Sequence, residues 1–289
     1  MTRKLVNTLC VIGVGLIGGS LARAARHHGL VDSIIGCGRD EAHLRKAVEL
    51  GVIDRYTTDI AEAVKEADLV VVAVPVNSIE AVFTAMRNAL ANNTVITDVG
   101  SVKGSVIKAS QSLGKYQSNF VPGHPIAGTE NSGVEASFAG LFDDRVVLLT
   151  PTEQTSAQAL NLVEQFWSAI SAEVIQLDAV HHDEVLAATS HLPHVLAFAL
   201  VDNLARTDSS QEIFRYAAGG FRDFTRIASS NPQMWSDICL ANDKALLNVL
   251  EAYMQDLGKL REAIAQKDSE SILKIFENAK RARDAFVIK

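Results

Sequence analysis

Cysteine is scarce in this chain of 289 residues, which contains only Cys10, Cys37 and Cys239. The three lie far apart in the sequence and form no Cys-x-x-Cys pair. Neither a disulfide framework nor a zinc site built from cysteines is therefore expected. Unpaired thiols of this kind favour a cytoplasmic location.

Positive charge is also in deficit. The 27 Lys and Arg residues stand against 34 Asp and Glu residues, which gives a formal net charge of −7. No basic run occurs, so nucleic acid and anionic membrane surfaces are not expected as partners. Single basic residues are still able to bind a small anion.

Long hydrophobic runs are absent as well. The longest uninterrupted apolar stretches, Leu69–Val76 and Val195–Val201, are much shorter than the roughly 20 residues of a membrane-spanning helix. Arg3 and Lys4, before an apolar run that starts at Leu9, have the outline of a secretory signal. Glycines interrupt that run at a spacing explained below, so we expect neither a signal peptide nor a membrane span.

What the first 178 residues do contain is a regular alternation of β-rich and helical stretches. The β-rich runs are continuously apolar, as in strands covered on both faces. Such alternation predicts a mostly parallel, doubly wound sheet. The expected strands are Thr8–Ile12, Ser33–Cys37, Leu69–Val74, Val95–Asp98, Phe120–Pro122, Val146–Thr150 and Glu173–Leu177, and the expected helices include Ile17–His28, Glu41–Leu50, Ser78–Leu90 and Ser156–Ile170.

From residue 179 to the end of the chain the pattern is helical. Val180–Arg206 predicts a long helix interrupted by Pro193, Asn231-Pro232 has the form of a helix start, and a last helix is expected from Ser269 to about Phe286. One long helix carries an apolar stripe at three- and four-residue steps, which either a core or a subunit interface explains. Few elements remain to cover it, so we favour an interface between two copies. The stripe consists of Leu246, Leu250, Tyr253, Leu257, Leu260 and Ile264.

A glycine-rich turn joins the first predicted strand to the first helix, and Gly13–Gly18 follows the G-x-G-x-x-G pattern. The first glycine permits a tight turn, the second lets the backbone approach a pyrophosphate, and the third lets the helix pack closely on the strand. The helix N-terminus then directs free N–H groups at the phosphates. A tight turn without a nucleotide is the alternative. The expected cofactor-binding residues here are Gly13, Gly15, Leu16, Ile17 and Gly18, together with Val74 and Pro75 at the end of a later strand.

The residues that follow the second predicted strand bear on the choice of cofactor. Gly38 stands where an NAD enzyme places an acidic residue for the ribose, and Arg39 suits a 2′-phosphate. Two points weaken this inference. Asp40 is an acidic residue close by, and the alternative for Arg39 is an ordinary surface residue. The expected cofactor is therefore NAD(P), with a slight preference for NADP.

A histidine lies where open α/β sheets bind ligands. The loops Asp98–Lys103 and Gly123–Glu130 both follow predicted strands and so lie at the carboxyl edge of the sheet. His124 suits acid–base catalysis near neutral pH, and the hydroxyl of Ser101 is expected to orient it. An ordinary loop hydrogen bond is the alternative role for this histidine.

Five motifs together resemble the prephenate/arogenate dehydrogenase family of tyrosine biosynthesis, over nearly the whole chain. The resemblance implies an α/β fold: a Rossmann-like, mostly parallel, doubly wound sheet, residues 1–178, followed by an all-helical dimerisation domain, residues 179–289. It implies a homodimer with a small-molecule substrate, and no fused chorismate mutase or appended regulatory domain is expected. The motifs are Gly13–Gly18, Asp98–Lys103, Gly123–Glu130, Ser190–His194 and Gly219–Arg226.

The reaction implied by the resemblance is oxidative decarboxylation of prephenate to 4-hydroxyphenylpyruvate, or of arogenate to tyrosine, with hydride transfer to NAD(P)+. His124 would accept the proton of the substrate hydroxyl, with Ser101 hydrogen-bonded to it. Arg226 would bind a substrate carboxylate through its forked donors. Glu130 is a candidate partner for the ammonium of arogenate, although a hydrogen bond within the protein explains it equally.

Further site residues are expected on the helical part. Ser190 and His194 share one helix face, and Pro193 is expected to kink the helix beside them. The resemblance adds His194 to the catalytic residues and makes Ser190 and His191 substrate contacts, with a satisfied core histidine as the alternative. Gly219-Gly220 predicts a turn that lets the chain approach the site closely. The resemblance implies that this stretch reaches across the dimer, so that Gly219 and Asp223 serve the partner's site.

The sequence also allows other interpretations. His181–Glu184 is expected to be a helix start with a solvated surface, and no metal site is predicted. A 3-hydroxyacid dehydrogenase or imine reductase-type enzyme would need a catalytic Lys or Asp on the helical half and leaves Ser190–His194 unexplained. A non-catalytic dinucleotide sensor would need only the glycine motif. The choice between prephenate and arogenate stays open.

Overall fold

The computed structural model describes residues 4–129 and 131–287. Its contacts divide the chain into two compact units, Met1–Asp243 and Lys244–Lys289. The first unit therefore contains the sheets and several helices beyond the expected boundary at residue 178. The reason is physical, because helices of the 179–243 segment hydrogen-bond directly to loops of the sheet, as described below.

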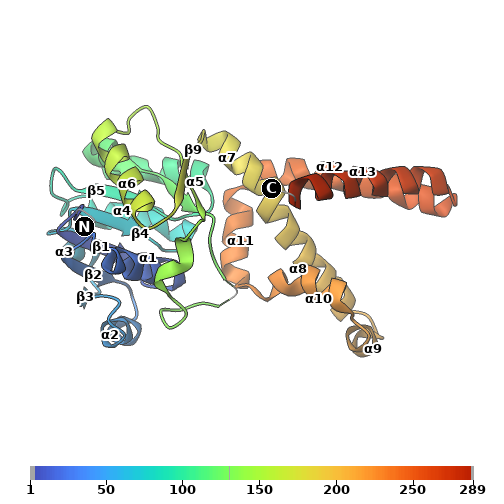
Figure 1. Ribbon diagram of the computed structural model, residues 1–289, viewed down its shortest axis with the longest axis horizontal. Coiled ribbons are helices and arrows are strands. Elements are labelled where there is room, and N and C mark those ends of the chain that lie inside the picture. Colours follow the sequence, from blue (N-terminus) through green and yellow to red (C-terminus); the bar gives the residue numbers. More distant parts are fainter. Residues whose placement is uncertain (1–3, 130, 288–289) are drawn as a thin grey trace. The chain divides into compact units, whose positions relative to one another are not determined.

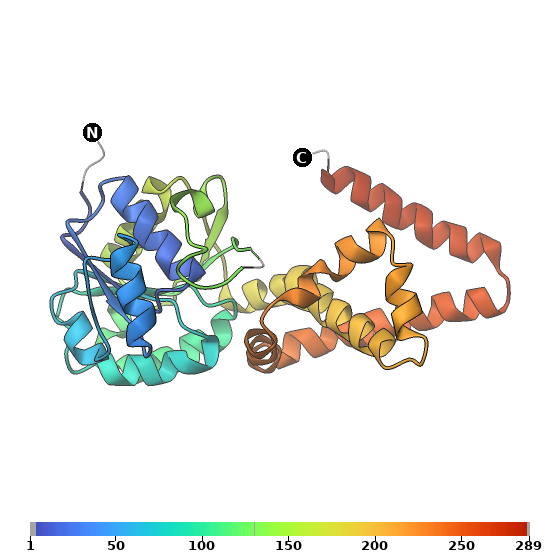
Figure 2. The ribbon, with the colours of Figure 1, turned by 90° about the horizontal axis from the view of Figure 1, so that it is seen from below.

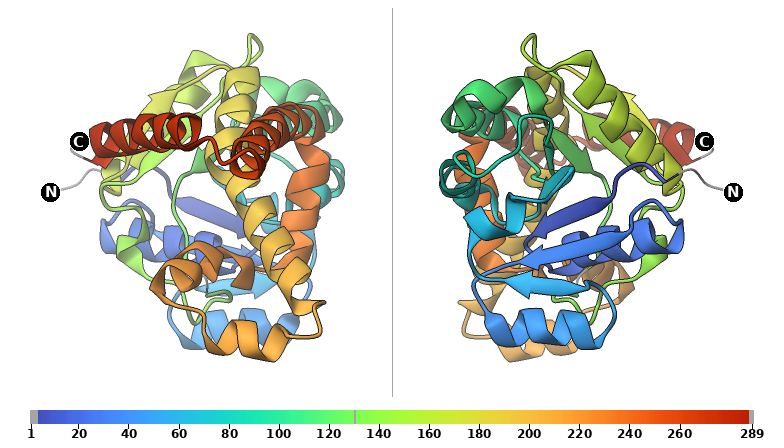
Figure 3. Two further views of the ribbon diagram at one scale, coloured as in Figure 1. Left: turned by 90° about the vertical axis from the view of Figure 1, so that its right-hand side faces the viewer. Right: turned by 90° about the vertical axis from the view of Figure 1, so that its left-hand side faces the viewer.

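Six parallel strands form the main sheet in the order β3-β2-β1-β4-β5-β6 (Figures 1 and 3). The strand order reverses between β1 and β4, where doubly wound sheets bind their ligands. The short β3 was not among the predicted strands. The strands are β1 (Thr8–Ile12), β2 (Ser33–Cys37), β3 (Arg55–Thr57), β4 (Leu69–Val72), β5 (Val95–Asp98) and β6 (Phe120–Val121).

Helices cover both faces of this sheet (Figure 2). Successive residues of β1 point to opposite faces, so that Leu9 lies in a cluster with Leu21 and Cys10 lies in a second cluster with Phe83. This arrangement confirms the predicted doubly wound sheet. The helices on the face of Leu9 are α1 (Leu16–His27), α2 (Glu41–Glu49) and α6 (Ala157–Ala169), and those on the opposite face are α3 (Ile60–Val64), α4 (Ile79–Met86) and α5 (Lys103–Ala109).

A second, three-stranded sheet follows in the chain. It contains β7 (Gly123–Pro125), β8 (Val146–Leu149) and β9 (Glu173–Gln176), with β7 antiparallel and β9 parallel to β8. The segment of β7 was expected to be a loop, but its backbone pairs in register with β8, and His124 lies opposite Leu148. Strand pairing therefore fixes the backbone at His124.

The remainder of the first unit is helical. Between α7 (Ala179–Leu186) and α8 (Leu192–Ala205) the backbone forms a π-helical turn at Ala187–His191, where the N–H of Leu192 donates to the carbonyl of Ala187. This wider turn lies directly before Pro193, the residue at which a kink was expected. The smaller helices are α9 (Ser210–Arg215), α10 (Gly219–Thr225) and α11 (Pro232–Ala241), and Asn231 caps α11 as predicted.

The continuous helical segment Ala179–Ala205 is long and apolar enough to span a membrane by length and composition, and it is the one such helix in the described residues. This segment has no long uninterrupted apolar run, because polar residues such as Ser190 and His191 divide its apolar stretches. The sequence therefore did not indicate a membrane-spanning helix here. Length and composition alone are weak evidence for a membrane span, since core helices of soluble proteins have the same properties.

The second unit consists of α12 (Asp243–Ala265) and α13 (Ser269–Val287), joined by a turn in which Lys267 has φ +58°. The predicted stripe lies on α12, and its Tyr253, Leu257 and Ile264 are exposed. On α13, Leu273 and Phe276 are also exposed. Large apolar side chains thus stay uncovered on both helices of this unit.

Candidate active site

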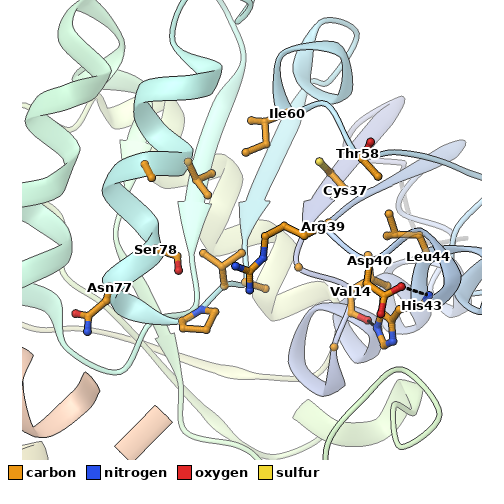
Figure 4. Close-up of a pocket in the computed structure, with 18 residues that line it drawn as sticks. Val14, Cys37, Arg39, Asp40, His43, Leu44, Thr58, Ile60, Asn77 and Ser78 are labelled. Carbon is orange, nitrogen blue, oxygen red and sulfur yellow. Dashed lines mark hydrogen bonds between the residues drawn. The ribbon is translucent and has the colours of Figure 1, made fainter. Parts of the chain in front are cut away.

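A cavity of about 850 Å³ lies at the carboxyl ends of β1, β2 and β4 (Figure 4). This is the position at which an α/β sheet of this strand order binds a dinucleotide. Its lining includes six residues predicted from the sequence to bind the cofactor, namely Gly13, Gly15, Gly38, Arg39, Val74 and Pro75.

The glycine turn has the geometry that a dinucleotide requires. Gly13 has φ +97°, and a Cβ there would lie 2.3 Å from the carbonyl oxygen of Ala73. A Cβ on Gly18 would lie 2.2 Å from the carbonyl oxygen of Gly13, so this glycine permits close helix packing. No described atom lies within 4 Å of a Cβ built on Gly15, which leaves open space for a pyrophosphate at the start of α1.

Leu16, Ile17 and Gly18 do not line the cavity. Leu16 and Ile17 pack against the apolar core instead, and Gly18 is buried at the strand–helix contact. Their contribution is therefore to shape the turn, and the groups that reach the cavity are the backbones of Gly13 and Gly15.

Arg39 is the basic side chain of the cavity, and Figure 4 shows it extended between Ser78 and Asp40. Asp40 is engaged elsewhere, because its Oδ1 accepts from the backbone N–H of His43 at 3.2 Å and caps α2. His43 in turn places Nε2 2.8 Å from the carbonyl oxygen of Val14. One oxygen of the carboxylate that weakened the inference about Arg39 thus caps the helix.

His124 is half-buried and lies in contact with a second histidine. Its Nδ1 is 2.9 Å from Nε2 of His182, whose Nδ1 is 2.8 Å from Oδ1 of Asp183. Burial lowers the pKa of His124 well below its usual value, and the neighbouring His182, Lys103 and His191 lower it further. His124 is therefore neutral at physiological pH, as a proton acceptor must be.

Ser101 follows β5 and is half-buried. Within the described residues its hydroxyl makes no hydrogen bond to His124, and His182 is the hydrogen-bond partner at Nδ1 of that ring. The predicted Ser101–His124 hydrogen bond is therefore not formed in this structure. The reason is that α7 brings a buried histidine to that side of the ring.

A buried ion pair holds the two loops of the site together. Lys103 Nζ lies 2.5 Å from Asp98 Oδ2 and also donates to the carbonyl oxygen of Gly123 at 2.6 Å. Asp98 accepts from the backbone N–H groups of Gly100 and Gly123. Burial lowers the pKa of Lys103, and the adjacent Asp98 carboxylate opposes that shift. The pair thus fixes the residue immediately before His124.

Asp183 joins α7 to the beginning of α5. Its two carboxylate oxygens accept from the backbone N–H groups of Lys103 and Gly104, each at 2.8 Å. Burial acts to raise the pKa of Asp183, but the hydrogen bonds from His182 and these N–H groups keep it below its usual value. The expectation of a solvated surface holds for the exposed His181 and Glu184 and is wrong for His182, which is fully buried.

His194 and Arg226 come together on the helical side. His194 Nδ1 donates to the carbonyl oxygen of Ser190 at 2.8 Å, and its ring stacks on Trp235 with centroids 3.5 Å apart. Burial lowers the pKa of His194, and the positive charge of Arg226 lowers it further, which places the guanidinium close to the imidazole. The structure thus brings together the two predicted residues and adds Trp235, which no sequence motif indicated.

His191 differs from the prediction. Its side chain is fully buried, and its Nδ1 lies 3.1 Å from Nδ2 of Asn242. The same amide nitrogen donates to the carbonyl oxygen of Asp183 at 2.8 Å. Since the imidazole is inaccessible, the structure gives His191 a role in helix packing rather than the predicted contact with substrate.

Three further predicted residues belong to the segment Gly219–Arg226 and to the loop after β7. Gly219 and Gly220 begin α10, and no described atom lies within 4 Å of a Cβ built on either, so open space surrounds both glycines. Asp223 is exposed on the same helix. Glu130 lies outside the described residues.

Family models match both parts of the chain. The model for "Prephenate dehydrogenase, nucleotide-binding domain" matches residues 21–176, and that for "Prephenate dehydrogenase, dimerization domain" matches residues 178–278. The chain belongs to the prephenate dehydrogenase family. This membership confirms the family and the fold class that the sequence motifs predicted, and it supports neither alternative function.

Curated relatives and solved structures agree with the family models. The cyclohexadienyl dehydrogenase of Zymomonas mobilis is 44% identical over 278 residues, which cover 95% of this chain and 94% of that protein. The prephenate dehydrogenase of Bacillus subtilis is 34% identical over 288 residues, 99% of this chain and 78% of that protein. The structure of prephenate dehydrogenase from Aquifex aeolicus with hydroxyphenyl propionate and NAD+ has a TM-score of 0.91 and 37% identity, and covers 97% of this chain and 98% of that one. Synechocystis arogenate dehydrogenase gives a TM-score of 0.81 at 28% identity, and covers 96% and 99% of the respective chains.

Proposed function

We propose that this protein catalyses the NAD(P)-dependent oxidative decarboxylation of prephenate to 4-hydroxyphenylpyruvate, or of arogenate to tyrosine. The observation that carries the proposal is the position of His124. It is a neutral histidine whose Nδ1 is hydrogen-bonded to His182. It lies at the carboxyl edge of the sheet, where the glycine turn leaves space for a dinucleotide. The similarity to the Zymomonas, Bacillus and Synechocystis enzymes supports the same reaction class.

Each chemical requirement of this reaction has a residue to meet it. A bound nicotinamide supplies the acceptor for the hydride of substrate C4. His124 accepts the proton of the 4-hydroxyl group, and loss of CO2 from C1 makes the ring aromatic. Arg226, close to His194, binds a substrate carboxylate through paired N–H donors. Ser101, at the same edge of the sheet, is left to hydrogen-bond the substrate hydroxyl.

For the cofactor we retain a slight preference for NADP. Arg39 extends into the cavity, Gly38 offers no acidic side chain, and the carboxylate of Asp40 caps α2. These features fit a 2′-phosphate better than a free ribose hydroxyl pair. The same cavity accepts the rest of either dinucleotide.

We also propose that the protein is a cytoplasmic homodimer. The dimerisation-domain match extends over residues 178–278, and α12 and α13 expose large apolar side chains such as Leu257 and Phe276. Large exposed apolar side chains of this kind are typical of a subunit interface. The three free thiols fit a reducing compartment.

The test is an assay of the purified protein with prephenate or arogenate and each cofactor. Reduced nicotinamide is expected to form in step with 4-hydroxyphenylpyruvate or tyrosine, identified by chromatography. Absorbance of reduced cofactor without an aromatic product would contradict the proposal. So would the absence of turnover with both substrates in a preparation that binds the cofactor.

A further inference from the structure

We propose that His182 and Asp183 are positioning residues, which hold His124 in the tautomer whose Nε2 carries no hydrogen and accepts the substrate proton. The tautomer follows from hydrogen bonds within this chain. Its catalytic consequence rests on the proposed function.

The argument begins at Asp183, because its partners leave no choice of donor and acceptor. The backbone N–H groups of Lys103 and Gly104 only donate, so both carboxylate oxygens of Asp183 accept. A carboxylate in such a setting is ionised, and the lowered pKa of Asp183 agrees with this. The 2.8 Å contact from His182 Nδ1 to Oδ1 is therefore also a donated hydrogen bond, and Nδ1 of His182 carries a hydrogen.

The state of His124 follows from that of His182. A neutral imidazole with hydrogen on Nδ1 has a bare Nε2, which accepts. His124 Nδ1 lies 2.9 Å from that Nε2, so it is the donor, and its own Nε2 is left without hydrogen. The opposite arrangement requires hydrogens on both ring nitrogens of His182, and the nitrogen-15 measurement described below distinguishes the two arrangements.

The arrangement also offsets part of the cost of protonating His124. Burial and the neighbouring His182, Lys103 and His191 all disfavour a positive charge on His124. When Nε2 takes the substrate proton, the N–H at Nδ1 becomes a stronger donor to His182, whose own N–H is held by the Asp183 carboxylate. The added charge is thus stabilised by a carboxylate two hydrogen bonds away, and the proton leaves to solvent after the product.

The direct test is nitrogen-15 NMR of the histidine side chains in the purified full-length enzyme. We expect His124 and His182 both to carry hydrogen on Nδ1 only, with the two signals assigned by His124→Asn and His182→Gln. Hydrogen on Nε2 of His124 in the wild-type enzyme overturns the proposal. Because this measurement needs no turnover, it stands even if prephenate and arogenate are not substrates.

Two variants test the catalytic consequence. His182→Leu removes the acceptor, so we expect the Nε2–H tautomer of His124 to appear and kcat to fall about 10- to 100-fold with little change in KM, a part of what a positioned base contributes. In His182→Gln the amide oxygen still accepts from Nδ1–H, so the tautomer and most of the kcat should be retained. The exposed neighbour His181→Gln is the control for changes to α7.

The outcomes separate positioning from packing. If His182→Leu leaves both tautomer and kcat unchanged, the proposal is wrong. If His182→Gln loses as much kcat as His182→Leu while keeping the Nδ1–H tautomer, tautomer control is not what His182 contributes and the proposal also falls. Should the leucine variant fail to fold, the wild-type spectrum and the glutamine variant still decide. Absence of wild-type turnover overturns the proposed function alone.

Discussion

Lys103 Nζ lies 2.5 Å from Asp98 Oδ2, and both side chains are fully buried. The ammonium also donates to the carbonyl oxygen of Gly123, the residue before His124. One charge pair therefore ties the end of β5 to the start of β7. Because neither partner reaches water, each depends on the other for compensation of its charge.

Replacing Lys103 with Met should accordingly destabilise the protein by about 3–5 kcal/mol, since the Asp98 carboxylate would stay buried without a cation. Urea unfolding followed by circular dichroism measures the change. Lys108→Met, at an exposed position of the same helix, serves as the control and should change stability little. A loss below about 1 kcal/mol for Lys103→Met would mean that water or another group compensates Asp98.

His124→Asn should leave the fold and cofactor affinity intact while kcat falls by roughly 10² to 10⁴, the contribution of a positioned base. The amide keeps a polar group at the site but does not accept a proton at neutral pH. Steady-state kinetics and a fluorescence titration with the cofactor provide the two measurements. A variant that keeps most of its kcat would remove this histidine from the mechanism.

Much of the fold could be predicted because local sequence patterns determine it. Buried parallel strands are continuous apolar runs, and the bounds of Thr8–Ile12, Ser33–Cys37 and Val95–Asp98 came out as predicted. The strand Arg55–Thr57 was missed because three partly polar residues carry no apolar run. Gly123–Pro125 was missed because Gly-His-Pro has little preference for a strand, and pairing with β8 decides its conformation.

The site was less predictable, for reasons of sequence distance. His124 and Arg226 were found because their motifs are local. His182 is buried beside Asp183, which accepts a hydrogen bond from the backbone of Lys103, 80 residues earlier in the chain. No local pattern distinguishes His182 from the exposed His181. The burial of His191 was not predicted for the same reason, because its partner Asn242 lies 51 residues further along the chain.

Arg226→Ala should raise the KM for prephenate or arogenate strongly, at a cost of about 2–4 kcal/mol, through loss of a charge-assisted pair with a carboxylate. The affinity for the cofactor alone should not change, because Arg226 lies beside His194, away from the glycine turn. Arg222→Ala, exposed on α10, is the matched control. Equal damage to cofactor binding would place Arg226 at the wrong site.

Arg39→Ala tests the choice of cofactor. If the guanidinium contacts a 2′-phosphate, its loss should reduce kcat/KM for NADP by about one to two decades and that for NAD far less, the effect of a contact worth roughly 1.5–3 kcal/mol. Lys46→Ala on the exposed face of α2 is the control. A wild-type enzyme that prefers NAD and is unaffected by Arg39→Ala would show that the residues after β2 were misread.

Stability should also depend on pH through His191. Burial lowers the pKa of His191 from 6.5 to about 4, with the neighbouring His182 and His194 lowering it and Asp183 opposing them. Between these two values the unfolded chain binds a proton that the folded protein does not, so the free energy of unfolding falls as the pH decreases from about 6.5 to 4. The full contribution of this group is about 3 kcal/mol.

His191→Leu isolates that contribution, because a leucine of similar size does not titrate. His124 and His194 also have lowered pKa values, so the wild-type protein loses stability to more than one histidine on acidification. We therefore expect the variant to lose less stability than the wild type between pH 7.5 and pH 5, although it lacks the hydrogen bond to Asn242 at either pH. Urea unfolding at both pH values gives the comparison. Parallel losses in the two proteins would mean that His191 is protonated, or accessible to water, in the folded state.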